Sequence, residues 1–264
     1  MRINSRFLFL TLLAATTTVS AQVQVSSALV MSHNLASGQR AADGVLTLSN
    51  PGDTPAQARI TLNDIKSDPK AGVVYLKAGA LPRSNASWIN LPSSSVTVPA
   101  HGKVSVPYHI TIPQNASQGT YWSVLLVQPV TAENVVKNQT PNNIVIKQVT
   151  QYAVQVLVNL PGGQAHLKFK QPELVKTADG ITLNVELTNT GERLSLPTTH
   201  AEIYDAQGKL VQKVVGRDRR VYPGLSVLET YQISGLKPGK YQVLVIADDK
   251  DNDVVGARYN ITVE

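Results

Sequence analysis

Cysteine is absent from the 264 residues of this chain. Its absence excludes a disulfide framework, a thiolate zinc site and a lipid anchor on cysteine. The fold must therefore be stabilised by the burial of a hydrophobic core. A chain of this length can build such a core, most naturally as two domains.

A strong charge of one sign is also missing. The chain has 24 Lys and Arg against 18 Asp and Glu, which gives a formal net charge of +6. So mild an imbalance indicates solubility rather than a nucleic-acid-binding surface. Long apolar runs are equally scarce, because no segment after the N-terminus approaches the ~18 consecutive apolar residues that a membrane helix requires.

The first residues have the pattern of a Sec-type secretory signal peptide. Arg2 and Arg6 form a basic start, an apolar run follows from Phe7 to Ala15, and Val19-Ser20-Ala21 offers small residues for cleavage. The apolar run is too short to span a bilayer. We therefore expect residues 1–21 to be removed, the mature chain to begin at Gln22, and the protein to be periplasmic.

Helical periodicity is scarce, whereas runs of Val, Ile, Thr and Tyr are separated at short intervals by Pro, Gly, Asn and Asp. This pattern predicts an all-β protein built of sandwiches. The segment Pro161–Gly163 ends a strand and continues nothing, so it predicts a linker between domains at 22–161 and 162–264. The expected strands are Val23–Met31, Val45–Ser49, Ala56–Leu62, Val73–Leu76, Ser94–Val98, Lys103–Ile112, Tyr121–Gln128, Ile144–Leu160, Ala165–Phe169, Ile181–Thr188, Ala201–Tyr204, Lys209–Val215, Ser226–Ile233, Tyr241–Ala247 and Val254–Val263.

Two features occur once in each half. The segments "SNPGDTPAQARITL" and "LTNTGERLSLPTTHAEI" both place an Asn-x-Gly turn between two strands. Further on, Gly119-Thr120-Tyr121 and Gly239-Lys240-Tyr241 both lead into an aliphatic strand. A Tyr at the start of the penultimate strand, bonded back to the preceding corner, is typical of immunoglobulin-like sandwiches. The repeat predicts two tandem Ig-like domains, in which the Asn-x-Gly turns reverse the chain.

Catalytic and metal-binding patterns are weak. The five histidines share no ligand spacing, and no nucleophile elbow, metalloprotease helix or phosphate-binding loop follows a strand. We expect a protein that is not an enzyme and has no cofactor or metal. Asp249, Asp251 and Asp253 alternate as calcium ligands do, but Val254 stands where that loop needs Gly and no Glu follows at its twelfth position. An acidic hairpin accounts for them as well, and calcium stays open.

The segment Ile144–Pro161, "IVIKQVTQYAVQVLVNLP", is long for a strand. Tyr152, Val154, Val156, Val158 and Leu160 share one face, which indicates the core. Its apolar start follows a long polar loop, so it could extend past the sheet and leave an open edge. Open edges that persist often bind a partner by strand addition. Alternatively, this is a long last strand that only closes the first domain.

Several segments together resemble the PapD-like periplasmic chaperones that escort fimbrial subunits. They are "LTLSNPGDTPAQARITLND", "SWINLPSSSVTVPAHGKVSVPYHITIP", "GTYWSVLLV" and the strand Tyr152–Pro161. The likeness covers most of the first domain, about residues 23–161. It implies two Ig-like domains in a boomerang, the last strand of the first lending alternating apolar side chains to an incomplete subunit. Peptidoglycan-associated Ig-like modules of surface proteins share part of this pattern.

One motif of that family is missing. The resemblance implies that an Arg on the first strand and a Lys on the last strand anchor the subunit's C-terminal carboxylate. Here the first strand, "QVQVSSALVMS", has no basic residue, and Gln151 stands where the lysine is expected. Lys147 and Arg40 are the nearest cations, and an anchor without charge loses its charge-assisted hydrogen bonds.

The sequence therefore predicts a non-enzymatic, chaperone-like protein that binds a secreted or pilus-type subunit by β-strand addition. The edge expected to pair is Ile144–Thr150, lined by Val124, Leu126 and Val149. The residues expected to bind the partner are Ile144, Val145, Ile146, Lys147, Val149, Gln151 and Arg40. The alternative is an envelope protein that binds peptidoglycan or a surface glycan through Tyr75, Trp88, Trp122 or the basic cluster Arg217–Arg220. Such tryptophans are more often core residues, and such a cluster is more often a solvated loop.

Overall fold

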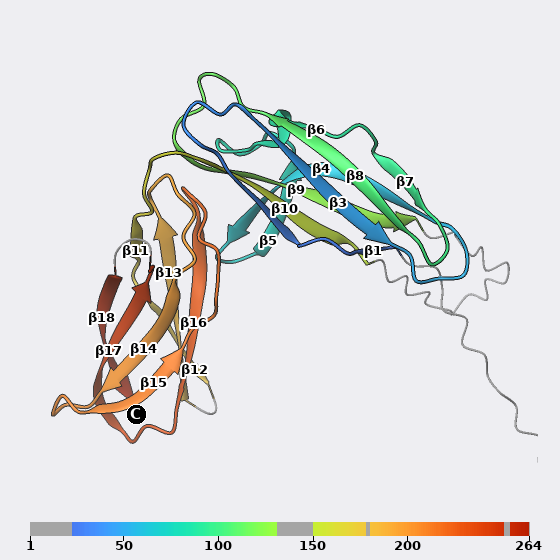
Figure 1. Cartoon of the computed structure of the whole chain (residues 1–264). Helices are drawn as coiled ribbons and strands as arrows, with labels where there is room; N and C mark the ends of the chain where they lie inside the picture. Colours follow the sequence, from blue (N-terminus) through green and yellow to red (C-terminus); the bar gives the residue numbers. More distant parts are fainter. Residues whose placement is uncertain (1–22, 131–149, 178–179, 251–253, 264) are drawn as a thin grey trace, which may run out of the picture.

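The chain folds as two immunoglobulin-like β-sandwiches, as the sequence predicts (Figure 1). The computed structural model describes residues 23–130, 150–177, 180–250 and 254–263, so the predicted signal peptide lies outside the described residues. Within these ranges no helix is long and apolar enough to cross a membrane. The domain limits 22–161 and 162–264 stay a prediction.

The first sandwich contains the strands β1 to β10. One sheet has the order β1-β3-β8-β6, and the other has the order β2-β10-β9-β4-β5 with β7 added to β4. Their inner faces bury one cluster that includes Leu46, Ile60, Tyr108, Leu125 and Val156. The strands are β1 (Gln24–Val25), β2 (Val30–Asn34), β3 (Ala41–Ser49), β4 (Ala56–Asp68), β5 (Gly72–Lys77), β6 (Ile89–Asn90), β7 (Ser95–Val98), β8 (Lys103–Thr111), β9 (Gly119–Val130) and β10 (Tyr152–Leu160).

The second sandwich contains the strands β11 to β18. In one sheet β13 pairs with β11, β12 and β16; the other sheet has the order β15-β14-β17-β18. The core between them includes Leu183, Ile203, Tyr231 and Val243. The strands are β11 (Leu167–Phe169), β12 (Glu173–Thr177), β13 (Gly180–Asn189), β14 (Thr198–Tyr204), β15 (Leu210–Val215), β16 (Ser226–Ser234), β17 (Gly239–Asp248) and β18 (Val254–Val263).

The two Asn-x-Gly turns are built alike. Asn50 and Asn189 are buried, and the side-chain oxygen of each accepts a hydrogen bond from the glycine two residues on, at 2.9 and 3.0 Å. The side-chain amide of Asn50 donates to the carbonyls of Thr54 and Val98. That of Asn189 donates to the carbonyls of Arg193 and Val221. A buried amide that satisfies several backbone groups fixes the turn in place.

Both tyrosine corners are confirmed. Tyr121 at the start of β9 accepts a hydrogen bond from the backbone N–H of Ser117. Tyr241 near the start of β17 donates a hydrogen bond of 2.8 Å to the carbonyl of Lys237. In each sandwich the tyrosine thus bonds to the residue four positions before it and fixes the start of its strand to the preceding corner.

Some strand predictions are wrong. Val23–Met31 is not one strand: β1 pairs with β3 antiparallel, whereas β2 pairs with β10 parallel, so the chain crosses from one sheet to the other after Val25. The predicted strand at Ala56–Leu62 continues to Asp68 and supports the hairpin to β5. The exposed strand β12 was missed because it buries no face and therefore carries no core periodicity.

The second Asn-x-Gly turn also joins the two sandwiches. It presents the carbonyl of Glu192 to the backbone N–H of Thr120 at 2.8 Å, and the N–H of Leu194 to the hydroxyl of Thr120 at 3.0 Å. Gly119 lies against the same carbonyl of Glu192, with φ at 99°. A glycine is required there, because a Cβ would come within 2.2 Å of that oxygen. The second turn therefore reverses the chain and docks it.

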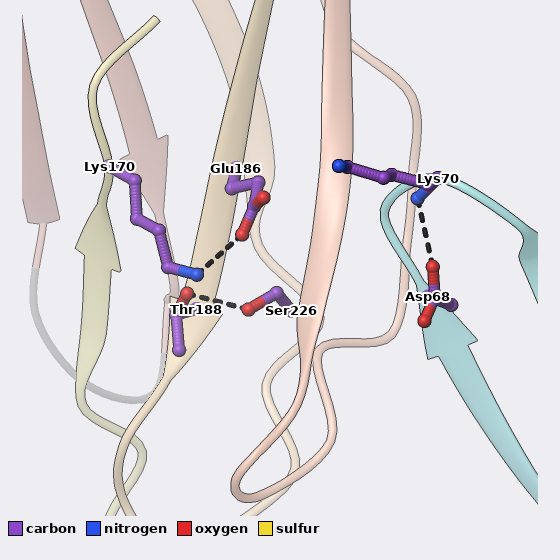
Figure 2. Close-up of polar contacts among 6 residues, drawn as sticks. All are labelled: Asp68, Lys70, Lys170, Glu186, Thr188 and Ser226. Carbon is purple, nitrogen blue, oxygen red and sulfur yellow. Dashed lines mark hydrogen bonds and ion pairs between the residues drawn. The ribbon is translucent and has the colours of Figure 1, made fainter.

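The β4–β5 turn makes a second approach between the sandwiches. Figure 2 shows Asp68 and Lys70 of this turn beside β16, and β4 contacts β16. The Asp68 carboxylate accepts hydrogen bonds from the backbone N–H groups of Ala71 and Lys70, both at 3.0 Å, which lower the pKa of this carboxyl.

Within the second sandwich, a hydrogen bond of 2.7 Å joins the hydroxyls of Thr188 on β13 and Ser226 on β16 (Figure 2).

Candidate strand-addition edge at the start of β10

The strand β10 is covered on one side along its whole length and on the other side only in part. It pairs with β9 from Tyr152 to Leu160. Its other neighbour, β2, pairs only with residues Gln155 to Asn159. The first three residues of β10 therefore have no strand partner on that side within the described part of the chain.

The direction of the backbone groups shows which residue faces the gap. The N–H of Gln155 donates to the carbonyl of Leu29 at 2.9 Å, and the carbonyl of Asn159 accepts from the N–H of Leu35 at 3.0 Å. These groups point to the β2 side, and the direction alternates along a strand. Ala153 therefore presents both its N–H and its carbonyl to the open side.

The β9 ladder stops at Tyr152 for a physical reason. Tyr152 lies opposite Val127, so the same register would place Thr150 opposite Pro129. That pair would need a backbone N–H that proline lacks. The prediction that one strand runs from Ile144 through Thr150 and Gln151 is wrong for these last two residues, which are exposed and outside β10.

The two faces of β10 have different surroundings. Val154, Val156 and Val158 are fully buried in the core of the first sandwich, and Tyr152 packs at its margin. On the other face, Ala153 and Leu157 join a second apolar cluster with Trp122, Val124 and Leu126 of β9. Val124 and Leu126, predicted as lining, lie opposite Gln155 and Ala153 in register. Val124 and Leu126 are themselves buried, and Tyr222 of the second sandwich belongs to the same cluster.

The predicted binding residues are not gathered into one site. Ile144, Val145, Ile146, Lys147 and Val149 lie outside the described residues. Gln151 directly precedes the open edge and is exposed. Arg40 precedes β3 next to Ala41, which pairs with Thr111 near the end where β10 finishes. Gln151 thus precedes the start of β10, whereas Arg40 precedes β3, which belongs to the other sheet.

Gln155 of β10 makes a polar contact with the second sandwich. Its side-chain oxygen accepts a hydrogen bond of 2.6 Å from the hydroxyl of Tyr222. The Tyr222 ring also packs on Trp122, with the ring centroids 4.5 Å apart. Burial raises the pKa of the Tyr222 phenol, so this hydroxyl stays a donor. Sequence reasoning missed this contact because no local pattern marks a side chain that docks on the other domain.

Two arginines near the junction donate hydrogen bonds to backbone carbonyls. Arg193 donates to the carbonyls of Leu160 and Gly162, at 3.1 and 3.0 Å. Arg83 donates to the carbonyl of Gln118 at 3.0 Å and lies over the ring of Tyr121. These arginines stabilise the junction, and neither stands on β2 or β10. The structure therefore places no basic pair on the described parts of those strands.

The residues considered for glycan contact have mixed surroundings. Trp122 is buried, its indole N–H donating to the carbonyl of Ile65 at 2.8 Å, and Trp88 packs against the core and Tyr121. Tyr75 is half exposed on β5. In the basic cluster, Arg219 pairs with the buried Glu229 at 3.7 Å. Both tryptophans are thus structural, as expected for such a sandwich.

The described residues form no cluster of metal-binding side chains. Among the residues that the structure describes, no three His, Asp or Glu side chains lie close enough to hold an ion. Asp251 and Asp253 of the acidic segment lie outside the described residues, and Asp249 is buried. The calcium hypothesis stays untested.

Comparison with known proteins gives a likeness of fold. No protein-family model and no curated protein matches the sequence. The solved structures that it resembles include fimbrial chaperones. CsuC in its complex with the tip adhesion subunit CsuE, from Acinetobacter baumannii, is 12% identical, with 90% of this chain and 97% of that chain covered and a TM-score of 0.47. The class 5 fimbriae chaperone CfaA is 11% identical, with 92% of this chain and 100% of that chain covered and a TM-score of 0.47.

A third solved structure, the Escherichia coli chaperone DraB, is 12% identical, with 92% and 98% of the two chains covered and a TM-score of 0.41. The resemblance to PapD-like chaperones is confirmed at the level of these neighbours. Identities and TM-scores this low carry no argument about the family or function of this chain. The function has to be argued from the edge of β10.

Proposed function

We propose that this protein is a non-enzymatic chaperone that holds an exported subunit of the pilus type by β-strand addition at the start of β10. The observation that carries the proposal is the unequal cover of β10, which β2 leaves open before Gln155. Its site centres on Ala153, whose N–H and carbonyl face the gap, and includes the exposed Gln151.

A subunit that lacks one strand of its own sandwich suits this edge. Such a subunit exposes an unpaired strand and an apolar groove, and both are costly in water. The strand β10 offers main-chain partners at Ala153, and Tyr152 and Val154 give its start an apolar character. Main-chain pairing supplies affinity, and the alternating side chains supply register. The predicted signal peptide would take the protein to the periplasm, where such subunits are met.

The missing basic pair changes the expected mechanism. Without a cation on the described parts of β2 and β10, a C-terminal carboxylate of the subunit gains no charge-assisted bond there. Binding would then depend on main-chain pairing and apolar contact, and its affinity should change little with salt.

Two variants test the main-chain mechanism. Ala153→Pro removes the N–H that faces the open side and breaks no hydrogen bond within the described chain, whereas Ala153→Val keeps it. We expect capture of a co-expressed subunit to be lost in Ala153→Pro and kept in Ala153→Val. Equal capture by both variants, with both folded by circular dichroism, would refute the proposal.

Photo-crosslinking identifies the partner. A photoreactive residue is placed at Gln151, and a control residue at Lys209 in the second sandwich, both of them exposed. A discrete adduct at Gln151 alone, identified by mass spectrometry as a small exported β-protein, supports the proposal. Adducts of equal yield at both positions, or sedimentation with cell wall in place of an adduct, would favour the envelope-binding alternative.

A further inference from the structure

A groove of about 750 Å³ lies on the outer face of the second sandwich, away from β10. Its floor comes from β17 and β18, through Gln242, Leu244, Arg258 and Asn260. Tyr204 at the end of β14 and the following turn form its wall. Volumes of this size are usual for small-molecule and cofactor sites.

The floor residues stand in rows across the strands. Tyr204 lies opposite Gln242, and Gln242 lies opposite Asn260. In the next row Leu244 lies opposite Arg258, and at the other end Lys240 lies opposite Thr262. Neighbouring strands are about 4.8 Å apart, so polar groups recur across the floor at nearly the length of one sugar unit in a polysaccharide.

The groove has an excess of positive charge. Lys240 and Arg258 are exposed and form no ion pair or hydrogen bond with another described residue. The nearby carboxylates are already engaged. Asp205 accepts hydrogen bonds from the backbone N–H groups of Gln207 and Lys209, at 3.0 and 2.9 Å.

Glu202, on the same face as Tyr204, is engaged as well. It accepts a hydrogen bond of 2.7 Å from the Tyr204 hydroxyl and pairs with Lys213 at 3.2 Å. The bond from Tyr204, followed by that from Lys213, lowers the pKa of the Glu202 carboxyl. Lys240 and Arg258 are therefore the cations left to attract a ligand.

A ligand on this floor cannot pair with the backbone of β14 or β17, because both strands already pair on both sides. β14 pairs with β15 and β17, and β17 pairs with β14 and β18. A ligand on the floor must therefore be recognised by side chains. The amides of Gln242 and Asn260 suit sugar hydroxyls, Tyr204 and Leu244 offer apolar surface to the C–H face of a ring, and the two cations suit carboxylates.

We propose that this groove binds an acidic polysaccharide, that is, a chain of carboxylate-bearing sugars. The proposal is independent of the strand edge at Ala153, because the groove belongs to the other sandwich. It places glycan contact on the outer face of β17 and β18, rather than on the tryptophans or the Arg217–Arg220 cluster.

The test is calorimetric titration of the full mature chain with soluble oligogalacturonate, and with an uncharged galactose oligomer as the neutral probe. The variant K240Q/R258Q removes both cations, and K77Q/K103Q removes two exposed lysines of the first sandwich as a matched control. We expect K240Q/R258Q to weaken binding of the acidic probe about tenfold or more and the control to leave it unchanged.

Three results would overturn the proposal. One is no heat of binding with oligogalacturonate at millimolar concentration. Another is an equal loss of affinity in K240Q/R258Q and K77Q/K103Q, which would mean attraction by net charge alone. The last is equal affinity for the neutral and acidic probes.

Discussion

The hydroxyl of Tyr222 in the second sandwich donates a hydrogen bond of 2.6 Å to the side chain of Gln155 in β10. The same phenol ring packs on Trp122 of β9. These contacts lie on the outer face of the strand whose opening residues form the candidate edge. The second sandwich thus supports the sheet that carries the site.

The first prediction concerns this contact. Tyr222→Phe should keep the ring packing and lose about 1 kcal/mol of stabilisation with the hydrogen bond, whereas Tyr222→Ala should lose about 3 kcal/mol or more. In Tyr222→Ala the junction loosens, so small-angle X-ray scattering should give a broader distribution of interatomic distances. An unchanged distribution for Tyr222→Ala would show that the other contacts hold the junction without it.

The second prediction concerns Gly119. A Cβ there would approach the Glu192 carbonyl oxygen to 2.2 Å, whereas Gly208 has positive φ but no atom within 4 Å of such a Cβ. Gly119→Ala should therefore reduce the free energy of unfolding by at least about 2 kcal/mol more than Gly208→Ala. Chemical denaturation measures both, and Gly208→Ala corrects for the strain of positive φ. Equal losses of unfolding free energy in the two variants would mean that the contact between Gly119 and Glu192 adds nothing to stability.

The third prediction concerns the paired turns. Asn50→Ala and Asn189→Ala each remove a buried amide that makes hydrogen bonds with several backbone groups, so each should destabilise its sandwich by about 2–4 kcal/mol. Only Asn189→Ala should also change the junction, because its turn carries Glu192 and Leu194. Nuclear magnetic resonance shifts of Thr120 report this, and identical Thr120 shifts in the two variants would contradict it.

The fourth prediction concerns pH. Glu229 of β16 is 1% exposed, and its carboxylate accepts a hydrogen bond of 3.0 Å from Thr199. Burial raises the pKa of this carboxyl, against the smaller opposing effects of Thr199 and the nearby arginines. A raised pKa favours the protonated form in the fold, so its stabilisation is complete below the unfolded pKa and is lost as pH rises through the folded pKa.

Glu229→Gln removes this titration and keeps a side chain of the same size. Its stability relative to the unchanged chain should therefore increase as the pH rises above about 4.3, the ordinary pKa of a glutamate. Thermal unfolding over a pH series measures the difference. A constant difference between the two proteins at all pH values would show that Glu229 does not titrate with folding.

Local sequence patterns predicted much of the fold. The alternation in β10, the Gly-x-Tyr steps and the Asn-x-Gly turns depend on neighbours in sequence, and the structure has each of them. The exposed strand β12 and the split of the first strand between two sheets had no such signal. They depend on pairing with β13, β3 and β10, which lie far along the chain.

The candidate site was only partly predictable. A strand edge near the start of β10 follows from the apolar run after a polar loop. One limit of the edge is set by Pro129, whose missing N–H ends the pairing of β9 with β10. The other is set by β2, whose pairing with β10 starts only at Gln155. Proline in β9 was visible in the sequence, but its partner across the sheet was not. The groove beside Tyr204 likewise required the register of three strands.

Amide hydrogen exchange at Ala153 tests the central claim most directly. In the free protein this N–H should exchange rapidly, because it faces the open side of β10. On binding of a captured subunit we predict that its exchange slows by at least about tenfold, whereas amides of β13, already paired on both sides, keep their rates. A stable complex in which Ala153 exchanges as fast as in the free protein would contradict strand addition at this edge.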